Sequence, residues 1–195
     1  MKKIIHILFV AIYLTQSSFA QNKTKIPTGF LQAMQGDWKG KLTYTDYQDD
    51  KSQTTMDVWL KSELINNKLV KQFFYKEPDG NTKQKAKSQD TTFIINNGSK
   101  LIETGYKHPF IIKDFTAKES EESSKKTTGG ITTKSSLNAM QEQIVIMETE
   151  DYDNEKLSTI RISIAITKNS LTIKKEVKYN GTENFFTRHT FYYTK

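Results

Sequence analysis

Apolar residues recur at every second position over most of this chain, which is the period of a β-strand with one buried face. In the clearest run, Ile160, Ile162, Ile164 and Ile166 alternate with Arg161 and other polar or small residues. The pattern predicts ten strands: 38–47, 56–64, 69–75, 93–95, 101–106, 110–115, one around 144–146, 160–166, 171–179 and 185–193. The polar stretch 82–87 is either an edge strand or a loop.

Short polar turns separate these strands, at 78–81, Asn97-Gly98, 151–155, 168–170 and Asn180-Gly181. Asn-Gly is a strong hairpin signal because both residues tolerate positive φ. Short connections make neighbouring strands antiparallel, and a sheet of about ten strands closes into a barrel or splits into a sandwich. The fold class expected here is all-β, an antiparallel up-and-down β-barrel.

A single helical turn is predicted just before the first strand. Thr28 can cap a turn that carries Phe30, Leu31 and Met34, and Gly36 can end it. We expect this turn to plug one end of the barrel.

The first twenty residues have the pattern of a secretory signal peptide. Lys2 and Lys3 precede a largely apolar run from Ile4 to Leu14, and cleavage is expected after Ala20. The run is shorter than the roughly 20 residues that a membrane-spanning helix needs. We therefore expect an exported single domain over residues 21–195, periplasmic or secreted. It would carry no lipid anchor, because no cysteine lies near the cleavage point.

Composition narrows the chemistry. The chain has no cysteine, which excludes disulfides, thiol catalysis and cysteine-ligated zinc. Removing the leader takes two lysines and lowers the formal net charge from +7 to +5. Because the remaining lysines are spread along strands with acids between them, we expect no nucleic-acid partner. The segment 118–130 has nothing to bury and is predicted to be a surface loop.

The opening Gly36-Asp37-Trp38, preceded by a helical turn, resembles the Gly-x-Trp signature of the lipocalin and calycin group. That resemblance implies that Trp38 packs at the barrel floor against an arginine of the last strand, for which Arg188 is the candidate. A guanidinium stacked on the indole would contribute about 0.5–2 kcal/mol. The predicted strand number exceeds that of true lipocalins and approaches that of fatty-acid-binding proteins.

Two further resemblances use the same region. Gly36-x-Trp38-x-Gly40 resembles the opening of the nitrobindin group, in which a C-terminal histidine ligates haem iron, and His189 would be that ligand. The alternative is a histidine on a strand face with no ligand. The run Trp38 to Tyr44 also resembles the opening of small exported bacterial proteins, and this resemblance does not indicate any particular activity.

The expected ligand-binding residues are those whose alternation directs them into the barrel: Leu42, Tyr44, Val58, Leu60, Phe73, Ile162, Ile164, Ile173, Lys175 and Tyr192. Lys175 shares the parity of Ile173 and Val177, and a lone buried charge is costly unless it is paired. It either anchors a ligand carboxylate or phosphate, lies at the barrel mouth or a bulge, or pairs internally with a glutamate.

No catalytic motif appears, and only His108 and His189 remain after cleavage. Acid clusters at 46–50 and 148–155 resemble solvated turns more than calcium loops. The leading hypothesis is therefore a non-enzymatic barrel without a resident cofactor, holding a small hydrophobic molecule. The alternatives are an envelope interaction protein with a solid barrel and, further off, a haem-binding barrel or an enzyme.

Overall fold

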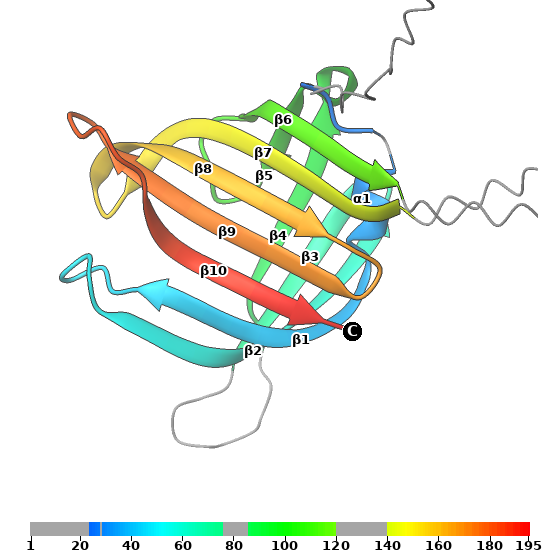
Figure 1. The fold of residues 1–195 in the computed structure, drawn as a ribbon, viewed down its shortest axis with the longest axis horizontal. Helices are drawn as coiled ribbons and strands as arrows, with labels where there is room; N and C mark the ends of the chain where they lie inside the picture. Colours follow the sequence, from blue (N-terminus) through cyan, green and yellow to red (C-terminus); the bar gives the residue numbers. More distant parts are fainter. Residues whose placement is uncertain (1–23, 28, 76–85, 120–139) are drawn as a thin grey trace, which may run out of the picture.

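The computed structural model describes residues 24–27, 29–75, 86–119 and 140–195. In them one closed sheet of ten strands, each antiparallel to its neighbours, forms an up-and-down barrel (Figure 1). The elements are α1 (Phe30–Ala33), β1 (Gly36–Thr45), β2 (Gln53–Ile65), β3 (Lys68–Tyr75), β4 (Ala86–Ile95), η1 (Asn96–Gly98), β5 (Lys100–Glu103), β6 (Phe110–Glu119), β7 (Met140–Asp153), β8 (Lys156–Ile166), β9 (Ser170–Tyr179) and β10 (Phe186–Thr194). The predicted fold class is confirmed.

Several strands are longer than the apolar pattern indicated. β4 begins at Ala86, before the predicted start at 93. The hydrophobic pattern missed its first half because the residues there are mostly polar. β7 continues to Asp153, and the turn consists of Asn154 and Glu155, both at positive φ, rather than the predicted 151–155. The predicted leader 1–20, the turn 78–81 and most of the loop 118–130 lie outside the described residues.

The barrel closes between its first and last strands. β1 and β10 pair antiparallel over six residue pairs, including Leu42 with Phe191. Gly40 is required in this seam, because a Cβ atom at that position would lie 1.9 Å from the carbonyl oxygen of Tyr192. The glycine of the opening motif therefore permits the two strands to approach each other.

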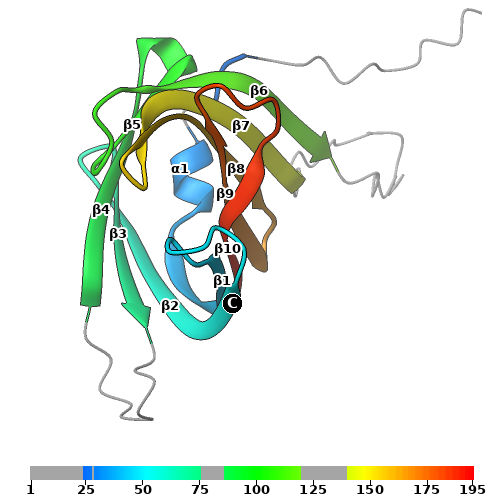
Figure 2. The ribbon, with the colours of Figure 1, turned by 90° about the vertical axis from the view of Figure 1, so that its left-hand side faces the viewer.

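The helix α1 lies within one end of the barrel (Figure 2), and buried apolar side chains surround it. Phe30 packs edge-on against Phe115 with ring centroids 6.1 Å apart. Trp38 is fully buried and donates from Nε1 to the Met34 carbonyl at 3.1 Å. The helix follows Gly29 without a side-chain cap, and Thr28 lies outside the described residues. None of the helices described has the length and apolar character to span a bilayer.

Trp38 does not meet Arg188, so that part of the expected closure is wrong. The β1–β10 register sets Thr194 beside Lys39 at the α1 end and His189 beside Tyr44 at the other. Lys195 supplies the cation over Trp38, with its Nζ 4.4 Å from the ring. Arg188 lies at the opposite end of β1, because antiparallel pairing carries the start of β10 to the end of β1.

Alternation assigned most of the expected interior residues correctly. Leu42, Val58, Leu60, Phe73, Ile162, Ile164, Ile173 and Lys175 are buried, and Tyr44 packs against the core half-buried. The prediction that Tyr192 points into the barrel is wrong, since 54 % of this residue is exposed. The pairing of β10 with β9 shifts by one residue between Thr187 and His189, and Phe191 and Tyr193 face inward instead.

Candidate binding cavity

A cavity of about 360 Å³ lies within the barrel, between β3–β5 on one side and β7–β10 on the other. Its apolar wall consists of Phe73, Ile162, Ile164, Ile173 and Phe191. Alternation positions these side chains, since each lies on the inward parity of its strand. Leu42, Tyr44, Val58 and Leu60 do not line it and belong to the packed core.

The rest of the lining is polar and charged. It comprises Lys71, Tyr75, Ser88, Asp90, Glu103, Thr104, Gly105, Tyr106, Asp151, Tyr152, Lys175 and His189. Gly105, at positive φ, and Tyr106 belong to the segment after β5, which closes part of this polar side. The cavity is therefore amphipathic, with an apolar wall facing a charged one.

Lys71 carries one of the two lining ammonium groups and is only 4 % exposed. Its Nζ lies 3.0 Å from Glu103 Oε1. Glu103 Oε2 also accepts from the Thr92 hydroxyl at 3.3 Å. This pair bridges β3 and β5 across β4, and it leaves Lys71 engaged with a protein carboxylate.

Lys175 carries the other ammonium group, and its Nζ lies 2.6 Å from Asp153 Oδ1. It faces inward as expected and forms an internal ion pair, but its partner is an aspartate and not the expected glutamate. The expectation that it is free to anchor a ligand anion finds no support in this geometry. Asp153 is 3 % exposed, so the pair is buried.

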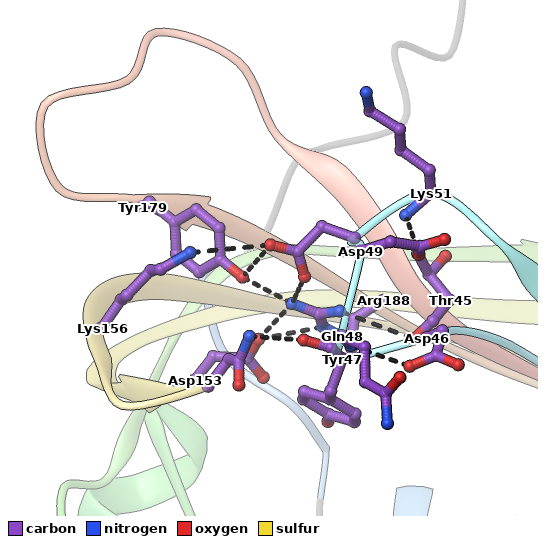
Figure 3. Close-up of polar contacts among 12 residues, drawn as sticks. Thr45, Asp46, Tyr47, Gln48, Asp49, Lys51, Asp153, Lys156, Tyr179 and Arg188 are labelled. Atoms are coloured by element: carbon purple, nitrogen blue, oxygen red, sulfur yellow. Dashed lines mark hydrogen bonds and ion pairs between the residues drawn. The ribbon is translucent and has the colours of Figure 1, made fainter.

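Asp153 also binds Arg188, which is completely buried, so one carboxylate serves two cations (Figure 3). Arg188 donates from Nε to Asp153 Oδ2 at 2.9 Å, and its Nη2 lies 2.8 Å from Asp50 Oδ1. Tyr179 joins by accepting from Nη2 and donating to Asp50 Oδ2. Hydrogen bonding and charge from Arg188 outweigh burial and lower the pKa of Asp50. This network fills the end of the barrel opposite α1.

Asp90 differs from the other lining acids because its carboxylate has no ion-pair or hydrogen-bond partner in the described part of the chain. It lies opposite Lys71 on the neighbouring strand. Burial raises the pKa of Asp90; the Lys71 charge opposes the rise and the Glu103 charge adds to it. Asp151, by contrast, accepts backbone N–H groups of Lys107 and Tyr152 with its two oxygens.

His189 and Tyr106 also present polar atoms to the cavity without a hydrogen-bond partner among the described residues. Burial, assisted by the Lys175 charge, lowers the pKa of His189 to about 4, so the imidazole is neutral near pH 7. Its ring packs edge-on against Phe191 at 5.2 Å. Burial raises the pKa of Tyr106 far above its usual value, so its hydroxyl stays protonated.

The side chains present do not fit a haem group ligated by His189. The cavity volume is at the small end of the range for ligand pockets. Charged pairs occupy much of its lining, where a broad macrocycle needs an apolar slot. We therefore assign no haem to His189, while His108 is exposed and does not line the cavity.

The acid clusters hold no recognisable metal site, since no group of three or more potential ligands comes together in the described residues. The interpretation as a solvated turn is also incomplete for 148–155, because Asp151 and Asp153 are buried. Glu148 pairs on the outer face with Arg161 at 2.8 Å. Strand alternation separates neighbouring acids onto opposite faces of β7.

Sequence reasoning missed Lys71, Asp90, Glu103 and Asp153, although the signal was present. Lys71 shares the parity of Leu69 and Phe73, and Glu103 shares that of Leu101. The rule that singled out Lys175 would have found both. Asp90 precedes the predicted strand 93–95, and Asp153 lies in the predicted turn 151–155, so neither was assigned to a strand.

Fold and cavity together define the class of this protein: a closed ten-stranded antiparallel barrel with a charged internal cavity. No family model matches the chain, and no curated protein matches its sequence. Among solved structures, the barrel is similar to that of Rv2717c from M. tuberculosis, with a TM-score of 0.50 and 10 % sequence identity. The match covers 88 % of this chain and 98 % of the other, and it establishes shared fold alone.

Proposed function

We propose that this protein is an exported, lipocalin-like barrel that binds a small, largely hydrophobic molecule in its internal cavity. The observation that carries the proposal is the cavity of about 360 Å³ with an isoleucine and phenylalanine wall. Burying apolar ligand surface against that wall would supply roughly 25 cal/mol per Å². A cavity of this size supports ligand binding over a solid barrel that acts only through its surface.

Binding of a fluorescent hydrophobic molecule tests this function. We expect N-phenyl-1-naphthylamine, which is neutral, to bind the purified protein with a rise in fluorescence. Ile164→Trp fills the cavity from β8 and should abolish that rise. The matched control is Ser163→Trp on the outer face of the same strand, which should leave binding unchanged. Equal binding to the wild type and Ile164→Trp, or no binding to any of them, would contradict the proposal.

Export is proposed on the positive, apolar and small-residue order of the first twenty residues. The full chain, expressed in a bacterial host, should be recovered from the periplasm or the medium. Its intact mass should be that of residues 21–195. An uncleaved mass in the cytoplasmic fraction would contradict export while leaving ligand binding open.

A further inference from the structure

The charged wall of the cavity indicates which charge a ligand should carry. Its lysines are paired with carboxylates, whereas not all of its acids are paired with cations within the described residues. Two lysines line the cavity against three acids, Asp90, Glu103 and Asp151. Both lysines are already bound to carboxylates at 3.0 Å or less. In a chain with a formal net charge of +7, this cavity has an excess of acid.

Within the described part of the chain, three lining groups have no hydrogen-bond partner and each can accept a hydrogen bond, although Tyr106 and His189 can also donate one. Asp90 offers both carboxylate oxygens, the Tyr106 hydroxyl has free lone pairs, and the neutral imidazole of His189 has one acceptor nitrogen. Neither Tyr106 nor His189 forms a hydrogen bond through its side chain within the described ranges. A ligand head with several N–H donors and a positive charge would satisfy such a set.

Aromatic rings extend this match. Tyr75, Tyr106 and Tyr152 contribute to the lining, and the rings of Tyr106 and Tyr152 already lie 5.9 and 5.1 Å from the Nζ atoms of Lys175 and Lys107. Their faces attract ammonium groups, and such contacts strengthen where water is excluded. An anionic head would instead meet the excess of carboxylate and would have to displace Glu103 or Asp153 from its lysine.

We propose, on the basis of the binding function above, that the ligand is a cationic amphiphile: an alkyl or aryl amine whose ammonium group lies at Asp90 and whose apolar part lies against the isoleucine wall. The ammonium replaces the missing partner of Asp90. The pairs Lys71–Glu103 and Lys175–Asp153 remain intact and keep anionic ligands out.

The test uses three probes with the same alkyl chain, octylamine, octanol and octanoate, each displacing N-phenyl-1-naphthylamine at pH 7. Octylamine should bind most tightly, at least about tenfold better than octanoate, because its ammonium group gives Asp90 a charge-assisted hydrogen bond. Asp90→Asn should weaken octylamine roughly tenfold and leave octanol unchanged. The matched control is Asp37→Asn, which removes the same charge from an exposed site on β1 and should change neither.

The outcomes separate this inference from the general function. If octanol and octanoate bind as well as octylamine, or if Asp90→Asn changes nothing, a hydrophobic cavity remains but the cationic specificity is wrong. If octanoate is preferred, the ligand opens one of the lysine pairs and the inference is overturned. If neither the naphthylamine nor any octyl probe binds, the binding function itself fails. Unchanged octanol affinity in Asp90→Asn shows that the variant is folded.

Discussion

The two ends of this barrel are built from different materials. Around α1, Phe30, Met34 and Trp38 pack into an apolar plug in which the indole N–H has a single backbone acceptor. At the other end, Arg188 and Asp153 lie equally buried in a network of ion pairs. Apolar packing is the less costly way to fill an interior, because buried ion pairs barely offset their desolvation. The contribution to stability therefore explains why the α1 end is apolar, but it does not explain why the other end is charged.

The largest effect on this difference between the two ends is expected from removing the Asp153 carboxylate, which pairs with both buried cations. Asp153→Asn leaves Lys175 and Arg188 buried with reduced compensation, and should lower the free energy of unfolding by about 3–5 kcal/mol. Urea denaturation followed by fluorescence measures it. Glu150→Gln, an exposed site on the same strand, should shift stability by less than about 0.5 kcal/mol. Similar small losses in both variants would mean that the charged end contributes as little as an exposed surface.

A smaller effect is expected from the pH dependence of His189. The pKa of its side chain is about 4 in the folded state, below its ordinary value of 6.5, so the unfolded chain binds the extra proton between these values. Stability therefore falls as the pH drops through 6.5 and this contribution stops changing below about 4. Between pH 7.5 and pH 4.5, the wild type should lose about 2 kcal/mol of unfolding free energy through this group. His189→Gln should not show that loss. Parallel urea midpoints for wild type and variant across that range would show that the imidazole is not buried neutral.

The smallest effect belongs to the apolar end. Lys195→Ala removes the ammonium over Trp38 and should lower the free energy of unfolding by about 0.5–1 kcal/mol, with a change in indole fluorescence. Lys168→Ala, in the β8–β9 turn, removes a lysine without this contact and should be neutral. If Lys195→Ala leaves the fluorescence unchanged, the terminal lysine does not lie on the ring.

Strand alternation predicted much of the fold because burial on one face imposes a period of two on side chains. It placed eight expected residues in the interior, including Lys175. It failed at Tyr192, where a shift in pairing between Thr187 and His189 reverses the faces that follow. Such a shift leaves no mark on hydrophobicity.

The candidate site was harder to predict, because its chemistry depends on pairs that only the closed sheet brings together. Lys71 meets Glu103 from a strand two positions away, and Asp153 meets Arg188 thirty-five residues later. Alternation says that each charge points inward, but register decides which charge it meets. Among the described residues these pairings leave Asp90 without a partner, which could not be read from its neighbours in sequence.

The seam between β1 and β10 sets a limit on when this protein can mature. The Gly40 strand can pair only after β10 has been made, and the register joins residues as far apart in sequence as Leu42 and Phe191. Contacts between residues that are far apart in sequence are slow to form. A chain leaving a ribosome therefore stays an open sheet until β10 emerges, with both edges vulnerable to misassembly and in need of protection during synthesis.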